Sequence, residues 1–112
     1  MYRRTNPGNA VVIVTDKTES IFSRSENFIR LKNKYPIIEV ISIHEHIDDS
    51  GKIISELSES GINPILRTVF KIAPEYILIH LKNADKNPSH EINLKNILKG
   101  AGFKNINISS SL

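Results

Sequence analysis

The feature that most constrains the fold of this chain is a pair of apolar runs rich in β-branched residues. Residues 10–14 read Ala-Val-Val-Ile-Val, and residues 76–81 read Tyr-Ile-Leu-Ile-His-Leu. A strand with apolar side chains on both faces belongs in the middle of a sheet that helices cover on each side. Both runs are therefore predicted to be central strands of a mainly parallel sheet.

Two less apolar segments complete the predicted sheet. Glu39 and Ser42 interrupt the apolar pattern of residues 37–43, and residues 103–109 alternate between apolar and polar side chains toward their end. Alternation is typical of a strand with one face exposed, so both segments are expected to be less buried than the central pair. Numbered along the chain, the four strands are predicted to take the order 2-1-3-4.

Apolar residues at helical spacing separate the strands. One helix is predicted over about residues 18–34, and Pro36 prevents its continuation. Another is predicted over residues 88–100, where Glu91 and Lys95 are spaced to form an ion pair one turn apart.

Two short helices are predicted between the second and third strands. The first presents an apolar face over residues 53–57 and stops at Gly61, because glycine enters the left-handed C-terminal position at low cost. The second begins at Asn63 and Pro64, an N-cap followed by proline at the first helical position, and covers residues 65–72.

This alternation predicts an α/β fold, a small three-layer αβα domain with a four-stranded, mainly parallel sheet of the Rossmann or flavodoxin-like kind. The 112 residues suffice for a single domain, 1–112, in which residues 1–9 are expected to form a flexible N-terminal tail. Cysteine is absent, and no apolar run is long enough to cross a membrane. We therefore expect a cytoplasmic protein with no membrane partner.

The chain is basic, with 15 Lys and Arg residues against 12 Asp and Glu residues and a net charge of +3. A basic chain can bind nucleic acid. The cations are scattered, however, and the nearest to a stripe, Arg30, Lys32 and Lys34, closes a predicted helix, where cations complement the helix dipole. Nucleic-acid binding is therefore an alternative function and not the leading one.

Polar residues collect where the predicted parallel strands end, which is where open α/β sheets bind ligands. Asp16 follows the first strand, Asp48 lies in the loop after the second, and His80 lies near the end of the third. These three are the candidate catalytic residues. Loops are commonly polar, so a structural role stays open, and for His80 a place at the edge of the core, with its ring nitrogens bonded to backbone, is favoured.

The sharpest local cluster is the pair His44 and His46. Two histidines separated by one residue on an extended segment point to the same side, so both imidazoles can bind one metal ion. Asp48 would bind a second ion or activate water. The predicted metal ligands are therefore His44, His46 and Asp48, and the cofactor would be a divalent metal ion. The other reading, a polar loop whose Asp and Ser residues cap the next helix, is favoured over the metal site.

Three segments resemble the receiver domain of response regulators. Residues 12–19 are similar to its first strand and acidic pocket, residues 74–82 to its third strand, which ends in the phosphorylated aspartate, and residues 103–111 to its fourth. Thr15 stands at the first acidic position and His80 at the phosphoacceptor position. The resemblance therefore implies a pseudo-receiver, an interaction surface without the magnesium-dependent phosphate switch.

Residues 41–51 resemble the His-x-His-x-Asp-His metal loop of the metallo-β-lactamase fold through the sequence His-Glu-His-Ile-Asp at 44–48, with Asp49 in place of the last histidine. This resemblance implies a metal-dependent hydrolase or phosphoesterase. The loop would hold the metal, and Asp16 and His80 would complete the site.

The leading expectation is a non-catalytic regulatory or protein-interaction domain. The chain contains no glycine-rich phosphate loop, no nucleophile elbow and no intact acidic pocket. The fourth strand is expected to be an exposed edge, at which self-association or pairing with a protein partner would occur. The metal-dependent hydrolase and the nucleic-acid-binding module are the alternatives.

Overall fold

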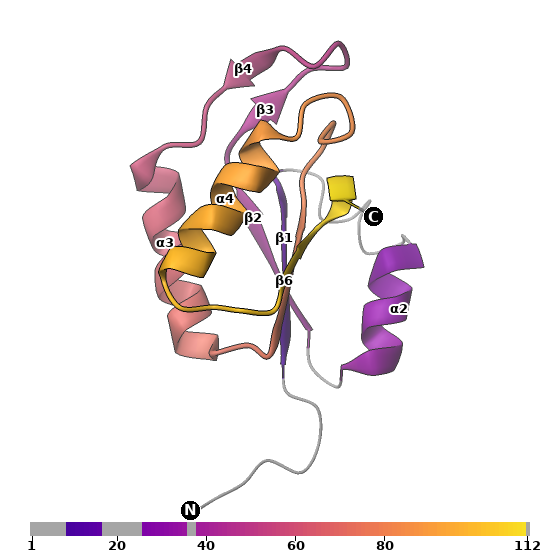
Figure 1. Ribbon diagram of the computed structural model, residues 1–112, viewed down its shortest axis with the longest axis vertical. Helices are drawn as coiled ribbons and strands as arrows, with labels where there is room; N and C mark the ends of the chain where they lie inside the picture. Colours follow the sequence, from indigo (N-terminus) through magenta and orange to yellow (C-terminus); the bar gives the residue numbers. More distant parts are fainter. Residues whose placement is uncertain (1–8, 17–25, 36–37, 112) are drawn as a thin grey trace, which may run out of the picture.

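Four parallel strands form the main sheet of the protein, in the order β2-β1-β5-β6 (Figure 1). The structure is a computed structural model that describes residues 9–16, 26–35 and 38–111. The strands are β1 (Ala10–Thr15), β2 (Ile38–Ile43), β5 (Tyr76–His80) and β6 (Ile106–Ile108). The predicted α/β class and four-stranded parallel sheet are confirmed, and the two most apolar strands, β1 and β5, lie at its centre.

β1 is buried along its whole length because it has an apolar layer on each side. Val11 and Ile13 belong to one core cluster, whereas Val12 and Val14 belong to the other. All four side chains are 0% exposed. A strand in this position needs an apolar side chain at every residue, which is why residues 10–14 form an unbroken apolar run.

Among the described residues, three α-helices cover the sheet, α3 and α4 on one face and α2 on the other (Figure 1). They are α2 (Glu26–Lys34), α3 (Glu59–Ile72) and α4 (Ser89–Gly100). Val69 of α3 and Leu94 of α4 pack into the first core cluster, and Leu31 of α2 packs into the second. The described part of the chain therefore has the three layers that the sequence predicts.

The segment after β2 forms a β-hairpin, so the predicted short helix over residues 53–57 is wrong. β3 (His46–Ile47) pairs in antiparallel orientation with β4 (Ile53–Ser55), forming a second, two-stranded sheet. Asp48 closes the turn by accepting two backbone hydrogen bonds on Oδ1, each 2.9 Å long, and Gly51 has the positive φ of 92° that the turn requires. Adjacent isoleucines suit a strand as well as a helix, and the turn before them decides between the two.

α3 is one continuous helix, so the predicted stop at Gly61 and restart at Asn63 and Pro64 are also wrong. The N-cap is Ser58, whose hydroxyl accepts a 3.2 Å hydrogen bond from the Gly61 N–H. Gly61 thus lies in the first turn, and Pro64 lies inside the helix. Ala73 ends the helix in the left-handed conformation, with a φ of 50°.

Some of the predictions fall outside the described residues, namely residues 1–8 of the predicted tail and residues 18–25 of the first predicted helix. The last tail residue, Asn9, is described, and its carbonyl accepts a 2.8 Å hydrogen bond from the Glu75 N–H. In the parts of the chain that the structure describes, no helix is long and apolar enough to cross a membrane.

Candidate functional site at the carboxyl edge of the sheet

A buried polar network lies at the carboxyl end of β1. The Thr15 hydroxyl accepts a 2.8 Å hydrogen bond from the Lys82 N–H and donates to Oε2 of Glu45. Oε1 of Glu45 lies 2.6 Å from Nδ1 of His90, whose Nε2 lies 3.2 Å from the exposed Glu56. Glu45 and His90 are only 2% and 1% exposed. The network therefore joins β1, the connection between β2 and β3, and α4 inside the protein.

A second buried carboxylate, Glu91, follows His90 on α4 and is 0% exposed. Its Oε2 accepts hydrogen bonds from the Leu81 N–H at 2.8 Å and the Ser109 hydroxyl at 2.5 Å. Its Oε1 accepts from the N–H of Ser110 at 3.0 Å and from the hydroxyl of the same residue at 2.7 Å. Glu91 therefore ties together the segments that follow β5 and β6.

The predicted surface pair between Glu91 and Lys95 is wrong, since Glu91 points inward. The sequence does contain a signal for this. Glu91 stands three residues before Leu94 and seven before Leu98, so it belongs to the same stripe of the helix as these two buried leucines. A carboxylate on an apolar stripe indicates a buried acceptor, whereas the pairing rule alone would place it at the surface.

His80 is the last residue of β5 and is half-buried at the edge of the core. Burial lowers the pKa of its imidazole below the ordinary value, and the Glu91 carboxylate opposes this effect. The protein environment therefore favours the neutral ring, which has one donor and one acceptor nitrogen.

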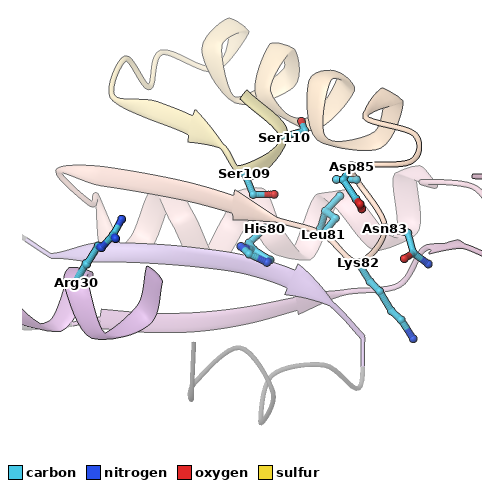
Figure 2. Close-up of a pocket in the computed structure, with 9 residues that line it drawn as sticks. Arg30, His80, Leu81, Lys82, Asn83, Asp85, Ser109 and Ser110 are labelled. Carbon is cyan, nitrogen blue, oxygen red and sulfur yellow. The ribbon is translucent and has the colours of Figure 1, made fainter. Parts of the chain in front are cut away.

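A cleft of about 550 Å³ opens beside His80, at the carboxyl ends of β5 and β6 (Figure 2). It is lined by Arg30 of α2, by the end of β5 with the loop that follows, and by Ser109 and Ser110. Figure 2 shows His80 next to Ser109, with Arg30 farther away on α2, whereas the Lys82 side chain extends away from them. This cleft is the candidate ligand site of the domain, and it lies at the carboxyl edge of the sheet, where open α/β sheets bind ligands, beside β5 and β6.

The predicted metal ligands His44, His46 and Asp48 are held differently from one another. The two histidines are exposed, and only Glu45 between them is buried. Asp48 serves the hairpin turn, and the hydrogen bond from the Ser50 hydroxyl, at 2.7 Å, is the main cause of a lowered pKa of its carboxyl group. Across residues 9–16, 26–35 and 38–111, no three His, Cys, Asp or Glu side chains are grouped to hold one metal ion. The metal site stays a prediction.

Asp16, the first candidate catalytic residue, is exposed beyond the end of β1. Its Oδ2 lies 3.3 Å from Nδ1 of His44, and the two side chains are 44% and 73% exposed. An exposed side-chain contact of this kind contributes little to stability. Of the two other candidates, Asp48 belongs to the hairpin turn and His80 lines the cleft.

Comparisons with known proteins inform the fold alone. No family model matches the chain, and no curated protein matches it. Among solved structures, the chain is similar to a chain of nucleotide-free acetone carboxylase, from a study of ATP-dependent acetone carboxylation, with 22% sequence identity and a TM-score of 0.61. The match covers 92% of this chain and 17% of the carboxylase chain, so the protein spans about a sixth of that longer chain.

Proposed function

We propose that this chain is a non-catalytic regulatory or protein-interaction domain, similar to a pseudo-receiver of the flavodoxin-like kind. One observation carries the proposal: the polar groups buried at the carboxyl edge of the sheet bind one another and the backbone. Glu45 is bonded to Thr15 and His90, and Glu91 is bonded to the segments after β5 and β6. Groups engaged in this way stabilise the fold and are not presented to a substrate.

The ends of the strands support the comparison with a pseudo-receiver. Asp16, His80 and Ser109 directly follow or end β1, β5 and β6. In a receiver, these places belong to the acidic pocket, the phosphorylated aspartate and a Ser or Thr. Here a histidine replaces the aspartate, and the Ser109 hydroxyl donates to Glu91. A domain with these substitutions would keep the surface of a receiver without its phosphate switch.

The interaction that we propose is pairing of β6 with β6 of a second copy. β6 lies at the end of the sheet order and pairs with β5 on one side. An edge strand presents a row of backbone N–H and C=O groups to which another strand can bond. The Asn107 side chain is exposed on this strand, so a charge introduced there would oppose pairing without entering the core.

Sedimentation velocity over a concentration series tests this proposal. The wild-type protein should associate as its concentration rises, and Asn107→Lys should weaken association about tenfold or more, the effect of ~1.4 kcal/mol. Asn96→Lys is the matched control, because Asn96 is exposed on α4 and its substitution should leave association unchanged. A wild-type protein that stays monomeric throughout, or equal effects of the two variants, would overturn the proposal.

The hydrolase and nucleic-acid alternatives stay predictions, since no contact between the described residues favours either. Nucleic-acid binding would be recognised by affinity that falls steeply with salt.

A further inference from the structure

The cleft beside His80 is not needed for pairing through β6, and its chemistry points to a ligand. It adjoins a second hollow of about 250 Å³, which lies along the same side of β5 and contains Lys34, Tyr76 and Asn107. Arg30 lines both spaces and is the residue that they share.

The guanidinium group of Arg30 is available to an anion. Its acidic neighbour on the helix, Glu26, is 3.7 Å away, and the side chains of Arg30 and Glu26 are 77% and 88% exposed. An exposed pair of this length contributes only a few tenths of a kcal/mol and is readily replaced by a better ligand. Arginine binds phosphate and carboxylate groups through two parallel N–H donors.

The opposite wall of the cleft offers hydrogen-bond acceptors. The hydroxyl protons of Ser109 and Ser110 are donated to Glu91, so the oxygens of both side chains keep lone pairs that can accept further hydrogen bonds. The exposed carboxylate of Asp85 is a further acceptor in the lining. A ligand that satisfies this wall must carry hydrogen-bond donors, and hydroxyl groups are the simplest donors for it.

We propose that the cleft binds a small hydroxylated organic anion of the sugar phosphate class. The phosphate would bind Arg30, and the sugar hydroxyls would donate to the oxygens of Ser109 and Ser110. His80 lines the same cleft, next to Ser109. The volume of about 550 Å³ suits such a ligand, since small-molecule sites have roughly 300 to 1,000 Å³.

Two-dimensional NMR of isotope-labelled protein tests the inference at constant ionic strength. Glucose phosphate, inorganic phosphate and glucose are added in separate titrations. Glucose phosphate should cause saturable shifts of the His80 ring signals and the Ser110 amide, with an affinity about tenfold or more above that of inorganic phosphate. Glucose alone should cause none.

Arg30→Gln should weaken the binding of glucose phosphate about tenfold or more, and it should not disturb folding because the side chain is exposed. Lys99→Gln is the matched control, since Lys99 is exposed in the last turn of α4, on the other face of the sheet. Absence of saturable shifts, equal affinity for glucose phosphate and inorganic phosphate, or equal effects of the two substitutions would overturn the inference. These readouts do not depend on self-association, so either proposal can fail alone.

Discussion

Substitution of Glu91 by glutamine is the sharpest test of how the carboxyl edge of the sheet is held. Each carboxylate oxygen accepts one backbone N–H, Oε2 from Leu81 and Oε1 from Ser110. A glutamine has only one oxygen. In either orientation of the amide, its NH2 group faces a backbone N–H that has no alternative acceptor in the described contacts. Glutamine therefore cannot reproduce the arrangement, although its size and shape match those of glutamate.

The expected loss of stability follows from the hydrogen bonds. One buried backbone N–H without a partner costs about 1–3 kcal/mol, and the remaining bonds lose roughly 1 kcal/mol each when the acceptor becomes neutral. Relief from burying a charge offsets part of this loss. We expect a net loss of about 2–4 kcal/mol for Glu91→Gln. With a urea dependence of ~2 kcal/mol/M, the unfolding midpoint should fall by about 1–2 M.

Urea unfolding followed by circular dichroism measures this shift, with Glu75→Gln as the control. Glu75 is exposed, so its substitution should change stability by no more than about 0.5 kcal/mol. Hydrogen exchange provides a local readout, because the amides of Leu81 and Ser110 should exchange faster in the Glu91 variant. If the two variants unfold at the same urea concentration, Glu91 does not hold the strand ends as we argue.

Three other predictions concern single residues. Burial lowers the pKa of His80 in the folded protein. As the pH falls, the His80 ring therefore gains its proton more readily in the unfolded chain than in the folded protein. The stability that depends on the neutral ring is complete above about pH 6.5 and is lost as the pH falls below it. His80→Gln should therefore flatten the fall in urea midpoint on acidification, and an unchanged slope would contradict this. Pro64→Ala should raise the melting temperature, because alanine restores an N–H that can donate to the Ser60 carbonyl and so adds about 1–2 kcal/mol to the free energy of unfolding. A lower melting temperature would show that the helix accommodates the proline without loss of stability. Gly51→Ala should lower the free energy of unfolding by about 1–2 kcal/mol, because φ is 92° at this position and the new Cβ would lie 3.1 Å from the Lys86 carbonyl oxygen. A variant with the melting temperature of the wild type would refute this.

The sheet could be predicted from the sequence because a strand that is buried on both faces has a recognisable local sequence pattern. A strand such as residues 10–14 needs apolar side chains at consecutive positions, and its composition shows this without knowledge of its neighbours. The hairpin after β2 has no such distinctive pattern in its own residues. Ile53 and Ile54 are compatible with a helix face and with a strand, and the choice depends on a turn made by Asp48 and on contacts with distant loops. Asn87 reaches the carbonyl of Gly51 across one such contact.

The candidate site was predictable in place but not in the roles of its residues. Polar residues do gather where the strands end, as the parallel topology requires. The pairing of Glu45 with His90, however, joins residues 45 and 90, and no local pattern connects them. His44 and His46, the histidines predicted to bind a metal, are exposed, and no pattern in the sequence shows that Glu45 between them is buried. Partners far apart in the chain become evident only when the fold brings them together.

The central position of β1 has a consequence for how the chain acquires its structure. Ala10 of β1 pairs with Ile38 of β2 on one side and with Tyr76 of β5 on the other. The middle of the sheet is therefore complete only when β5, which is distant in the sequence, has paired with β1. Contacts of such long range make folding slow, since the entropy of a large loop is lost before the pairing compensates for it. During synthesis, β1 leaves the ribosome before residues 76–80 and has no second neighbour until they follow. Until then the sheet is incomplete, and the exposed apolar strand favours aggregation.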